Sequence, residues 1–504
     1  MGEELKKSPS VKKNYIYNLI YQIFTMIIPI VTTPYISRVL LPDGIGKYSY
    51  TYSVVSYFVL FAQLGFGYYA QREIAKFQGN KYKQSVIFYE IMIVKSISVA
   101  LSLTLYIIMG LSGVFGEYVV LMWWWIPLIV TQEVDIAFLF QGNEEFKKIV
   151  IRNFFIKILG IILIFTLIKK QDDVWLYIFS IALSNFLGAM STWVYLPKFI
   201  CKIKREDIHP LKHILPTIRI FIPTVAAVIY TYLDKTLIEA LIKGTYVNSF
   251  GVIKKYSDLE NGFYEQSGKI ITVGISIITA LGAVMLPRNS KEYANGNKEK
   301  LINNIYLVLN FVFMIGCPMM LGLEAIAPNL IPWFLGNGYE KCILYLRIFS
   351  PLVLLFGLDN VFGIQYLLPT GREKKYTIAI VTGTVINILL NILFIPKLFG
   401  KGAIIASILA EIIIVGIMYL FVKKEISLNT VLVNSKNYWI ASCIMFGLLL
   451  VIQSRMPPGV VQTFSLIVVG AIIYGACLFI LKDNVFIKFI KETIIKLKIK
   501  KYER

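Results

Sequence analysis

About fourteen apolar segments, each about twenty residues long, follow one another along this chain with short polar breaks between them. The first two lie near 14–40 and 45–70, and the last two near 437–454 and 460–481. Only 16% of the 504 residues are charged, whereas a soluble protein carries about 25%. The segments do not alternate polar and apolar residues, so they predict helices rather than barrel strands. We therefore expect an all-α, polytopic integral membrane protein with about 14 transmembrane helices.

The lysines and arginines fall mainly in every second loop. If the N-terminus is cytoplasmic, the basic loops around Arg72, Lys147 and Lys202 all lie inside the cell, as the positive-inside rule requires. We therefore expect a protein of the cell membrane with both termini in the cytoplasm. Topology and contact with anionic membrane lipids account for the net charge of +21, and no nucleic acid is expected as a partner. The tail 483–504 mixes Ile, Phe and Leu with Lys and predicts a basic amphipathic helix on the cytoplasmic surface.

Several short motifs occur twice. Lys47-Tyr48-Ser49 returns as Lys255-Tyr256-Ser257, and Leu64-Gly65 before Gly79-Asn80-Lys81 returns as Leu281-Gly282 before Gly296-Asn297-Lys298. Such repeats are a construction plan of membrane transporters, whose substrate site lies between the repeats. The prediction is two pseudo-symmetric six-helix lobes around a central cleft, plus two extra helices. The expected boundaries are an N-lobe at 1–200, a cytoplasmic linker at 201–213, a C-lobe at 214–424, the extra helices at 425–482 and the tail at 483–504.

The first, second, seventh and eighth segments hold most of the polar residues, which fits helices that line a watery cleft. Basic residues among them favour an anionic substrate, and a diphosphate headgroup is the clearest candidate. The candidate substrate-binding cations are Arg38, Lys47, Lys235 and Lys255. Each could instead be a structural anchor that reaches the membrane surface.

Buried carboxylates are candidates for binding a driving cation. Asp234, Asp258 and Asp359 are the candidates, although carboxylates at such depth are often structural instead. Lys95 and Lys157 lie near the middle of their segments, and Glu90, Glu133 or Asp135 could pair with them.

Side chains for catalysis are scarce. The chain has five cysteines and two histidines, His209 and His213, with Pro210 between them. No nucleophilic triad or zinc set can be assembled from these, so we expect no catalytic residue, no metal site and no cofactor. No nucleotide-binding loop occurs either, which leaves a Na⁺ or H⁺ gradient as the candidate driver.

Six further motifs run through nearly the whole chain. They are Pro34-Tyr35, Ser37-Arg38-Val39-Leu40, Gly44-Ile45-Gly46, Gln71-Arg72-Glu73-Ile74-Ala75, Phe140-Gln141-Gly142 and Leu368-Pro369-Thr370-Gly371-Arg372-Glu373. These motifs resemble those of bacterial polysaccharide flippases of the Wzx type, in the multidrug/oligosaccharidyl-lipid/polysaccharide (MOP) exporter superfamily.

The resemblance implies a transporter that moves undecaprenyl-diphosphate-linked oligosaccharides across the cytoplasmic membrane by alternating access. Enzymes of polysaccharide biosynthesis are then expected partners. A lipid II flippase remains an alternative, because it shares the fold and a cationic cleft. A cation-coupled small-molecule antiporter of this fold would prefer an acidic cleft, and a polytopic polysaccharide polymerase would need a large outer loop.

Overall fold

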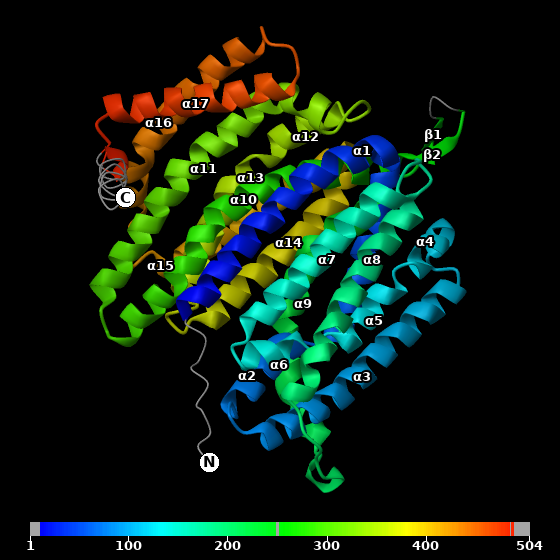
Figure 1. Ribbon diagram of the computed structural model, residues 1–504. Coiled ribbons are helices and arrows are strands. Elements are labelled where there is room, and N and C mark those ends of the chain that lie inside the picture. Colours follow the sequence, from blue (N-terminus) through cyan, green and yellow to red (C-terminus); the bar gives the residue numbers. More distant parts are fainter. Residues whose placement is uncertain (1–10, 248–250, 484, 488–504) are drawn as a thin grey trace, which may run out of the picture. The chain divides into compact units, whose positions relative to one another are not determined.

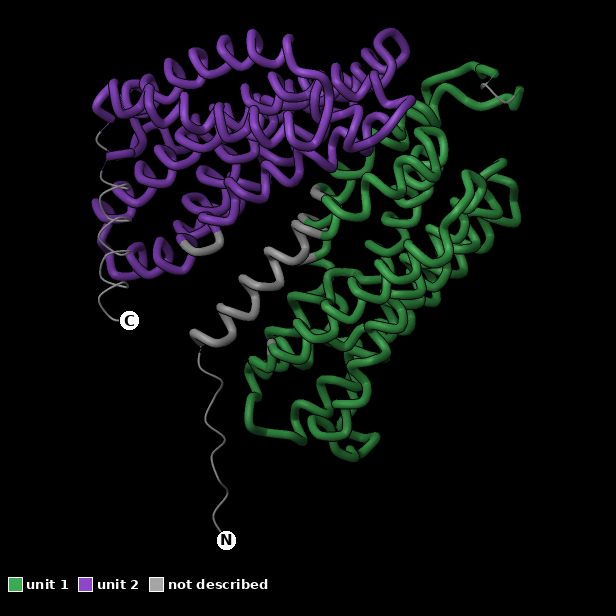
Figure 2. The backbone as a smooth tube through the Cα atoms, turned by 45° about the horizontal axis from the view of Figure 1, so that its top comes forward, with its two compact units in different colours: residues 1–262 green, residues 263–504 purple. Residues whose placement is uncertain are grey.

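The computed structural model describes residues 11–247, 251–483 and 485–487. They divide into two compact units, residues 1–262 and 263–504 (Figure 2). The predicted all-α membrane fold is confirmed, since helices make up nearly all of both units (Figure 1). The units divide within a helix, α10, rather than at the expected linker, and the boundaries expected from the repeat remain predictions. The predicted tail helix lies mostly outside the described residues.

Unit 1 is built around α1, which contacts α3, α5, α7, α8 and α9. Its helices are α1 (Val11–Gln63), α2 (Phe66–Lys76), α3 (Lys81–Leu111), α4 (Val119–Trp123), α5 (Ile126–Val134), α6 (Ala137–Gly142), α7 (Phe146–Leu167), α8 (Val174–Ser191) and α9 (Ile214–Leu241), with short 3-10 helices at Gly116–Tyr118, Thr192–Lys198, Arg205–Asp207 and Pro210–His213. A cluster of buried side chains that includes Leu40, Tyr106 and Trp125 forms part of its core.

Helix α1 covers the first predicted segment and most of the second. Its 53 residues would span roughly 80 Å at 1.5 Å each, far more than a bilayer core, so it crosses twice. The helical geometry is interrupted at Leu41 (φ 57°, ψ 173°), directly before Pro42. Proline disfavours helical geometry in the residue before it, which explains the position of this break.

An antiparallel hairpin joins α9 to α10. Strand β1 (Thr245–Val247) pairs with β2 (Ile253–Lys255), with Tyr246 opposite Lys254. These strands could not be predicted from the sequence, because three residues are too few to show alternation.

Unit 2 contains most of α10 (Tyr256–Ala294), and its other helices follow in chain order. They are α11 (Lys298–Phe334), α12 (Lys341–Phe349), α13 (Pro351–Asp359), a π-helix (Asn360–Leu367), α14 (Glu373–Leu398), α15 (Gly400–Val422), α16 (Leu428–Gln453) and α17 (Val460–Ile480). The last two pack on α11, and the indole of Trp333 donates to Thr463 at 2.7 Å.

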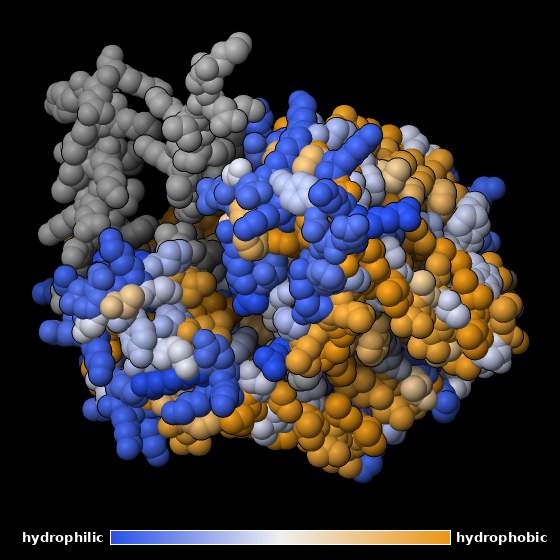
Figure 3. Space-filling view, turned by 90° about the horizontal axis from the view of Figure 1, so that it is seen from below, coloured by the Kyte–Doolittle hydropathy of each residue, from blue (hydrophilic) through white to orange (hydrophobic). Residues whose placement is uncertain are grey.

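The flanks of the helices are apolar. Exposed hydrophobic side chains follow one another on α3 (Leu101, Leu105, Ile108), α14 (Leu389, Ile392, Leu393) and α17 (Phe464, Val468, Ile472). In the space-filling view, hydrophilic residues gather in patches and hydrophobic residues cover much of the remaining surface (Figure 3). Eleven helices in the described residues are long and apolar enough to span a membrane, and thirteen if two bent pairs each count as one span. One of the eleven, Ile28–Lys76, runs from the middle of the first predicted segment to beyond the end of the second, so it stands for two of the predicted fourteen.

The predicted linker, 201–213, is fastened to the first half of α3. The backbone N–H of Cys201 donates to the hydroxyl of Ser85 at 2.8 Å, and the hydroxyl of Tyr82 donates to Asp207. Further along, the fully buried carboxylate of Glu90 accepts from the backbone N–H of His209 at 2.7 Å and from the ammonium of Lys212 at 2.8 Å.

His213 completes this attachment. Its ring is buried between the other oxygen of Glu90, 2.9 Å from Nε2, and the hydroxyl of Tyr69, 2.7 Å from Nδ1. The linker is therefore a bound segment of unit 1 rather than a loose tether.

Candidate functional site

The hairpin carries two lysines that pair with distant parts of unit 1. The ammonium of Lys254 lies 2.7 Å from Asp43, at the break in α1, and both side chains are nearly buried. The side-chain amide of Gln171 donates to the same carboxylate at 3.1 Å. Because neither charge faces open water, removing one partner would leave the other charge poorly compensated.

Lys255 lies between two glutamates. Its ammonium is 2.6 Å from Glu117 and 3.0 Å from Glu239, and it sits over the ring of Tyr118, 4.9 Å from the ring centroid. The hydroxyl of Tyr118 is 2.9 Å from both Glu239 and Asp258, to which it can donate its single proton. We call these residues the hairpin cluster: Asp43, Glu117, Tyr118, Glu239, Lys254, Lys255 and Asp258.

Burial and neighbouring charges shift the pKa values of two side chains of the hairpin, Lys255 and Tyr246. Burial alone lowers the pKa of Lys255, but its hydrogen bonds to Glu117 and Glu239 outweigh burial, and the pKa is raised overall. Burial, together with the charges of Asp43 and Asp258, raises the pKa of Tyr246 to about 12. At neutral pH the lysine is therefore fully charged and the phenol is neutral.

Two glycines bring α1 and the start of α10 into backbone contact. A Cβ atom at Gly46 would lie 1.7 Å from the carbonyl oxygen of Asp258, and one at Gly262 would lie 2.0 Å from that of Pro42. Both distances are far below any real contact, so only glycine fits. The contact places the two copies of the repeated Lys-Tyr-Ser motif beside each other, because each glycine contact lies within five residues of one copy.

The structure brings two of the four predicted cations to this region. Lys255 belongs to the hairpin cluster, and Lys47 lines a cavity of about 190 Å³ with Asp43, Glu117 and Lys254. The other two are placed elsewhere. The guanidinium of Arg38 is exposed and donates to the carbonyl of Pro34 at 2.9 Å, and the ammonium of Lys235 lies over the ring of Tyr232.

The three predicted carboxylates are also divided. Asp258 belongs to the hairpin cluster, and Asp234 is buried on α9 beside Lys235. Asp359 lies in unit 2, where α13 passes into the π-helix, and its Oδ1 has no hydrogen-bond partner among the described residues. Among all the residues that the structure describes, no three Asp, Glu, His or Cys side chains come together as metal ligands.

The acidic half of the hairpin cluster was not predicted from the sequence. Asp43, Glu117 and Glu239 were not selected as site residues, although each stands close to the end of an apolar segment. Their positions near segment ends were the available signal. Their partners are between 16 and 211 residues away along the chain, and nothing in the sequence pairs them.

Comparison with solved structures identifies the fold. Lipid II flippase MurJ in an inward closed conformation superposes with a TM-score of 0.75 at 16% identity, covering 94% of this chain and 99% of the other. An inward-facing multidrug resistance transporter of the MATE family and MOP superfamily gives 0.60 at 17% identity, covering 84% and 96%. This chain therefore has the fold that these two transporters share.

Sequence comparison identifies the family. The family model described as polysaccharide biosynthesis protein matches residues 11–293, and the chain belongs to that family. A protein of Escherichia coli (strain K12) named putative O-antigen transporter is 25% identical over 421 residues, which cover 82% of this chain and 97% of that protein. Lipid II flippase MurJ of Bacillus subtilis (strain 168) is 22% identical over 205 residues, covering 39% of this chain and 36% of that protein.

Proposed function

We propose that this protein flips undecaprenyl-diphosphate-linked oligosaccharides across the cytoplasmic membrane for the synthesis of a surface polysaccharide. Membership of the polysaccharide biosynthesis family and the MOP fold support a transporter of this kind. The relatives that match over nearly their whole length are named putative O-antigen transporters, whereas the lipid II flippase relative matches over about a third of its length. This difference favours an oligosaccharide repeat unit over lipid II.

The hairpin cluster is the proposed gate. It joins α1 and the segment around Glu117, from the first repeat, to α9, the hairpin and α10, from the second. This contact between the repeats is the observation that carries the mechanism, because alternating access requires contacts that close one face and separate when that face opens. Opening would break the ion pairs of Lys254 and Lys255 and part the two glycine contacts.

The lysines of the gate have a second use in this mechanism. When the gate opens, Lys255 loses Glu117, and a diphosphate offers several anionic oxygens in its place. Lys47, Arg38 and Lys235 would extend the same cationic path along α1 and α9. The substrate headgroup thus replaces carboxylates that hold the gate closed, and its lipid tail stays in the bilayer.

A cation gradient is the proposed driver. Asp359 is buried and keeps one oxygen without a partner among the described residues, as a site for Na⁺ or H⁺ would require. Asp234 and Asp258 are the further candidates. Asp359→Asn is expected to preserve substrate binding and remove the dependence of flipping on an imposed Na⁺ or H⁺ gradient. If the variant responds to the gradient like the parent, Asp359 is not the coupling residue.

The proposed location is the cytoplasmic membrane, with both termini in the cytoplasm and biosynthetic enzymes as neighbours on either side. Basic loops on one side support this orientation. Labelling of single cysteines placed at Lys202 and at Ile253, which is 69% exposed in the hairpin, tests it in intact cells. The hairpin position should react with a membrane-impermeant maleimide and the linker position should not.

The transport experiment uses proteoliposomes with undecaprenyl-diphosphate oligosaccharide in the outer leaflet, and glycosidase protection is followed over time. The parent protein should protect the glycan, and the Lys47→Ala/Lys255→Ala pair should lose most of that protection. Lys436→Ala, an exposed lysine on α16, is the matched control. Absence of protection by the parent for every diphosphate-linked glycan, with uptake of a soluble cation instead, would replace the proposal with an antiporter.

A further inference from the structure

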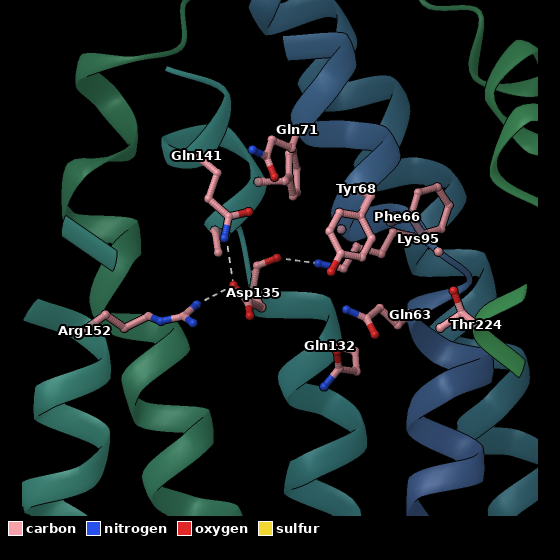
Figure 4. Close-up of a pocket in the computed structure, with 14 residues that line it drawn as sticks. Gln63, Phe66, Tyr68, Gln71, Lys95, Gln132, Asp135, Gln141, Arg152 and Thr224 are labelled. Carbon is pink, nitrogen blue, oxygen red and sulfur yellow. Dashed lines mark hydrogen bonds and ion pairs between the residues drawn. The ribbon is translucent and has the colours of Figure 1, made fainter. Parts of the chain in front are cut away.

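Unit 1 contains a second cavity, of about 300 Å³, that none of the predicted site residues lines. Figure 4 shows it between the α1–α2 turn and helices α5 and α6, with Lys95 from α3, Arg152 from α7 and Thr224 from α9 reaching its edges. We call it the glutamine pocket, because four glutamines line it: Gln63, Gln71, Gln132 and Gln141.

The charged groups that line the pocket already have partners within the protein. Arg152 pairs with Asp135 at 2.7 Å, and its other nitrogens donate to the side-chain oxygen of Asn153. Lys95 is nearly buried, donates to the backbone carbonyl of Asp135 at 2.5 Å and lies over the ring of Phe138. A diphosphate needs free cations, so this pocket is poorly suited to that part of the substrate.

The glutamine amides, by contrast, are available. Within the described residues the side chains of Gln63, Gln71 and Gln132 make no hydrogen bond to protein. Polar side chains inside membrane helices are costly unless they meet water, a partner or a ligand. These amides come from three helices, α1, α2 and α5, and all of them line the same cavity.

The turn between α1 and α2 builds one wall of this cavity. Gly65 has φ +76°, a left-handed conformation that few other residues adopt, and a Cβ there would also lie 3.1 Å from the carbonyl oxygen of Thr217. The turn brings Gln63, from the end of α1, and Gln71, from α2, to the same pocket. It also presents the ring of Tyr68, which is 77% exposed.

Amides and an open aromatic ring suit a sugar. A hydroxyl both donates and accepts hydrogen bonds, and so does a glutamine amide. The ring of Tyr68 offers a flat apolar surface with a polar tip for the C–H face of a pyranose. A lipid chain would leave the amides unpaired. The volume lies at the lower end of the about 300–1,000 Å³ typical of small-ligand sites, enough for a sugar ring rather than a whole oligosaccharide.

We propose that the glutamine pocket is a saccharide subsite that binds one sugar ring of the lipid-linked glycan. The inference rests on the proposed function and extends it: the cations proposed above bind the diphosphate, and this pocket binds one sugar. It assigns specificity for the glycan to Gln63, Gln71, Gln132, Gln141 and Tyr68.

The test is lipid binding to the full-length protein in nanodiscs. The probes are undecaprenyl diphosphate and the same lipid carrying one glucose, galactose or N-acetylglucosamine. At least one sugar-bearing lipid should bind the parent about tenfold more tightly than the bare lipid, a difference of about 1.4 kcal/mol. Gln63→Leu/Gln132→Leu should erase that preference and leave the affinity for the bare lipid unchanged. Gln453→Leu/Gln462→Leu, in unit 2, is the matched control.

The outcomes separate the two proposals. If the parent binds bare and sugar-bearing lipids equally, or the pair variant keeps the preference, the subsite is refuted and the flippase stands. If the parent binds none of the lipids, the proposed function fails with it. If the pair variant also loses its affinity for the bare lipid, binding by Tyr68→Ala is measured next. The ring of Tyr68 is exposed, so it can be removed without disturbing the packing. Loss of the sugar preference alone supports the subsite, and an unchanged preference refutes it.

Discussion

Gly46 lies against the backbone of Asp258 so closely that a methyl group would stand 1.7 Å from its carbonyl oxygen. Gly262 stands in the same relation to Pro42. The two contacts are reciprocal, since each helix supplies one glycine and one backbone segment. Neither clash can be relieved by turning a side chain, because the obstructing atoms are backbone. The crossing of α1 and α10 therefore depends on the absence of two Cβ atoms.

Gly46→Ala and Gly262→Ala should each force this crossing apart. Overpacking of this kind costs about 1–3 kcal/mol, so the thermal midpoint of the purified protein should fall. The rate of flipping should fall further than the loss of stability alone would explain, because the gate can no longer close. Gly416→Ala and Gly447→Ala, where a methyl group meets nothing within 4 Å, are the controls. Equal effects at all four positions would show that helix composition, not the crossing, is responsible.

The Asp43–Lys254 pair should show strong coupling in a double-mutant cycle. Asp43→Ala and Lys254→Ala each leave a nearly buried charge without its partner, at a cost of about 2 kcal/mol or more. The double variant should be less destabilised than the sum of the two. Thermal unfolding of all four proteins at equal pH measures the coupling, and additive effects would mean that the pair contributes nothing as a pair.

The contribution of Lys255 should not depend on pH between about 6 and 9. A lysine whose pKa is raised on folding contributes stability that is fully present below its unfolded pKa of about 10.4. That stability is lost only as the pH rises through the folded pKa. The difference in thermal midpoint between the parent and Lys255→Ala should therefore stay constant over this range, with Lys255→Arg as the charge-preserving control. A difference that shrinks toward pH 9 would contradict the ion pairs.

Glu90→Ala should release the linker. The buried carboxylate accepts hydrogen bonds from three residues of the segment, and its loss leaves His209, Lys212 and His213 without their acceptor. Limited trypsin digestion should then cut among Lys202, Lys204 and Arg205 about tenfold faster, since cleavage follows the population of the open segment. Glu299→Ala, an exposed glutamate on α11, should digest like the parent. Unchanged cleavage of Glu90→Ala would mean that the linker is held by other contacts.

Hydropathy predicted the helices well because a bilayer imposes a simple rule: each crossing needs about twenty apolar residues. The break before Pro42 was also visible, since the turn Leu41-Pro42-Asp43-Gly44 separates two apolar segments. The hairpin was not visible, because its strands have three residues each. The repeat drew attention to Lys47 and Lys255, and the structure places both near Glu117. Their role in binding substrate remains a prediction.

Partners of charged groups could not be predicted, because pairing depends on distances through space. Lys95 was expected to meet a carboxylate, and it donates instead to the backbone carbonyl of Asp135. Glu90 holds the linker rather than a lysine of a neighbouring segment. Trp125 is fully buried in the core of unit 1. Composition places such a residue in the membrane, but only packing decides which way its ring faces.

Helix α3 binds the linker both before and after Lys204. Ser85 holds Cys201 on one side, and Tyr82 and Glu90 hold Asp207, His209 and Lys212 on the other. A nick after Lys204 would thus leave two fragments that remain assembled without a covalent bond. The chain is in this sense already divisible, and its two parts could be encoded by separate genes and still meet along α3.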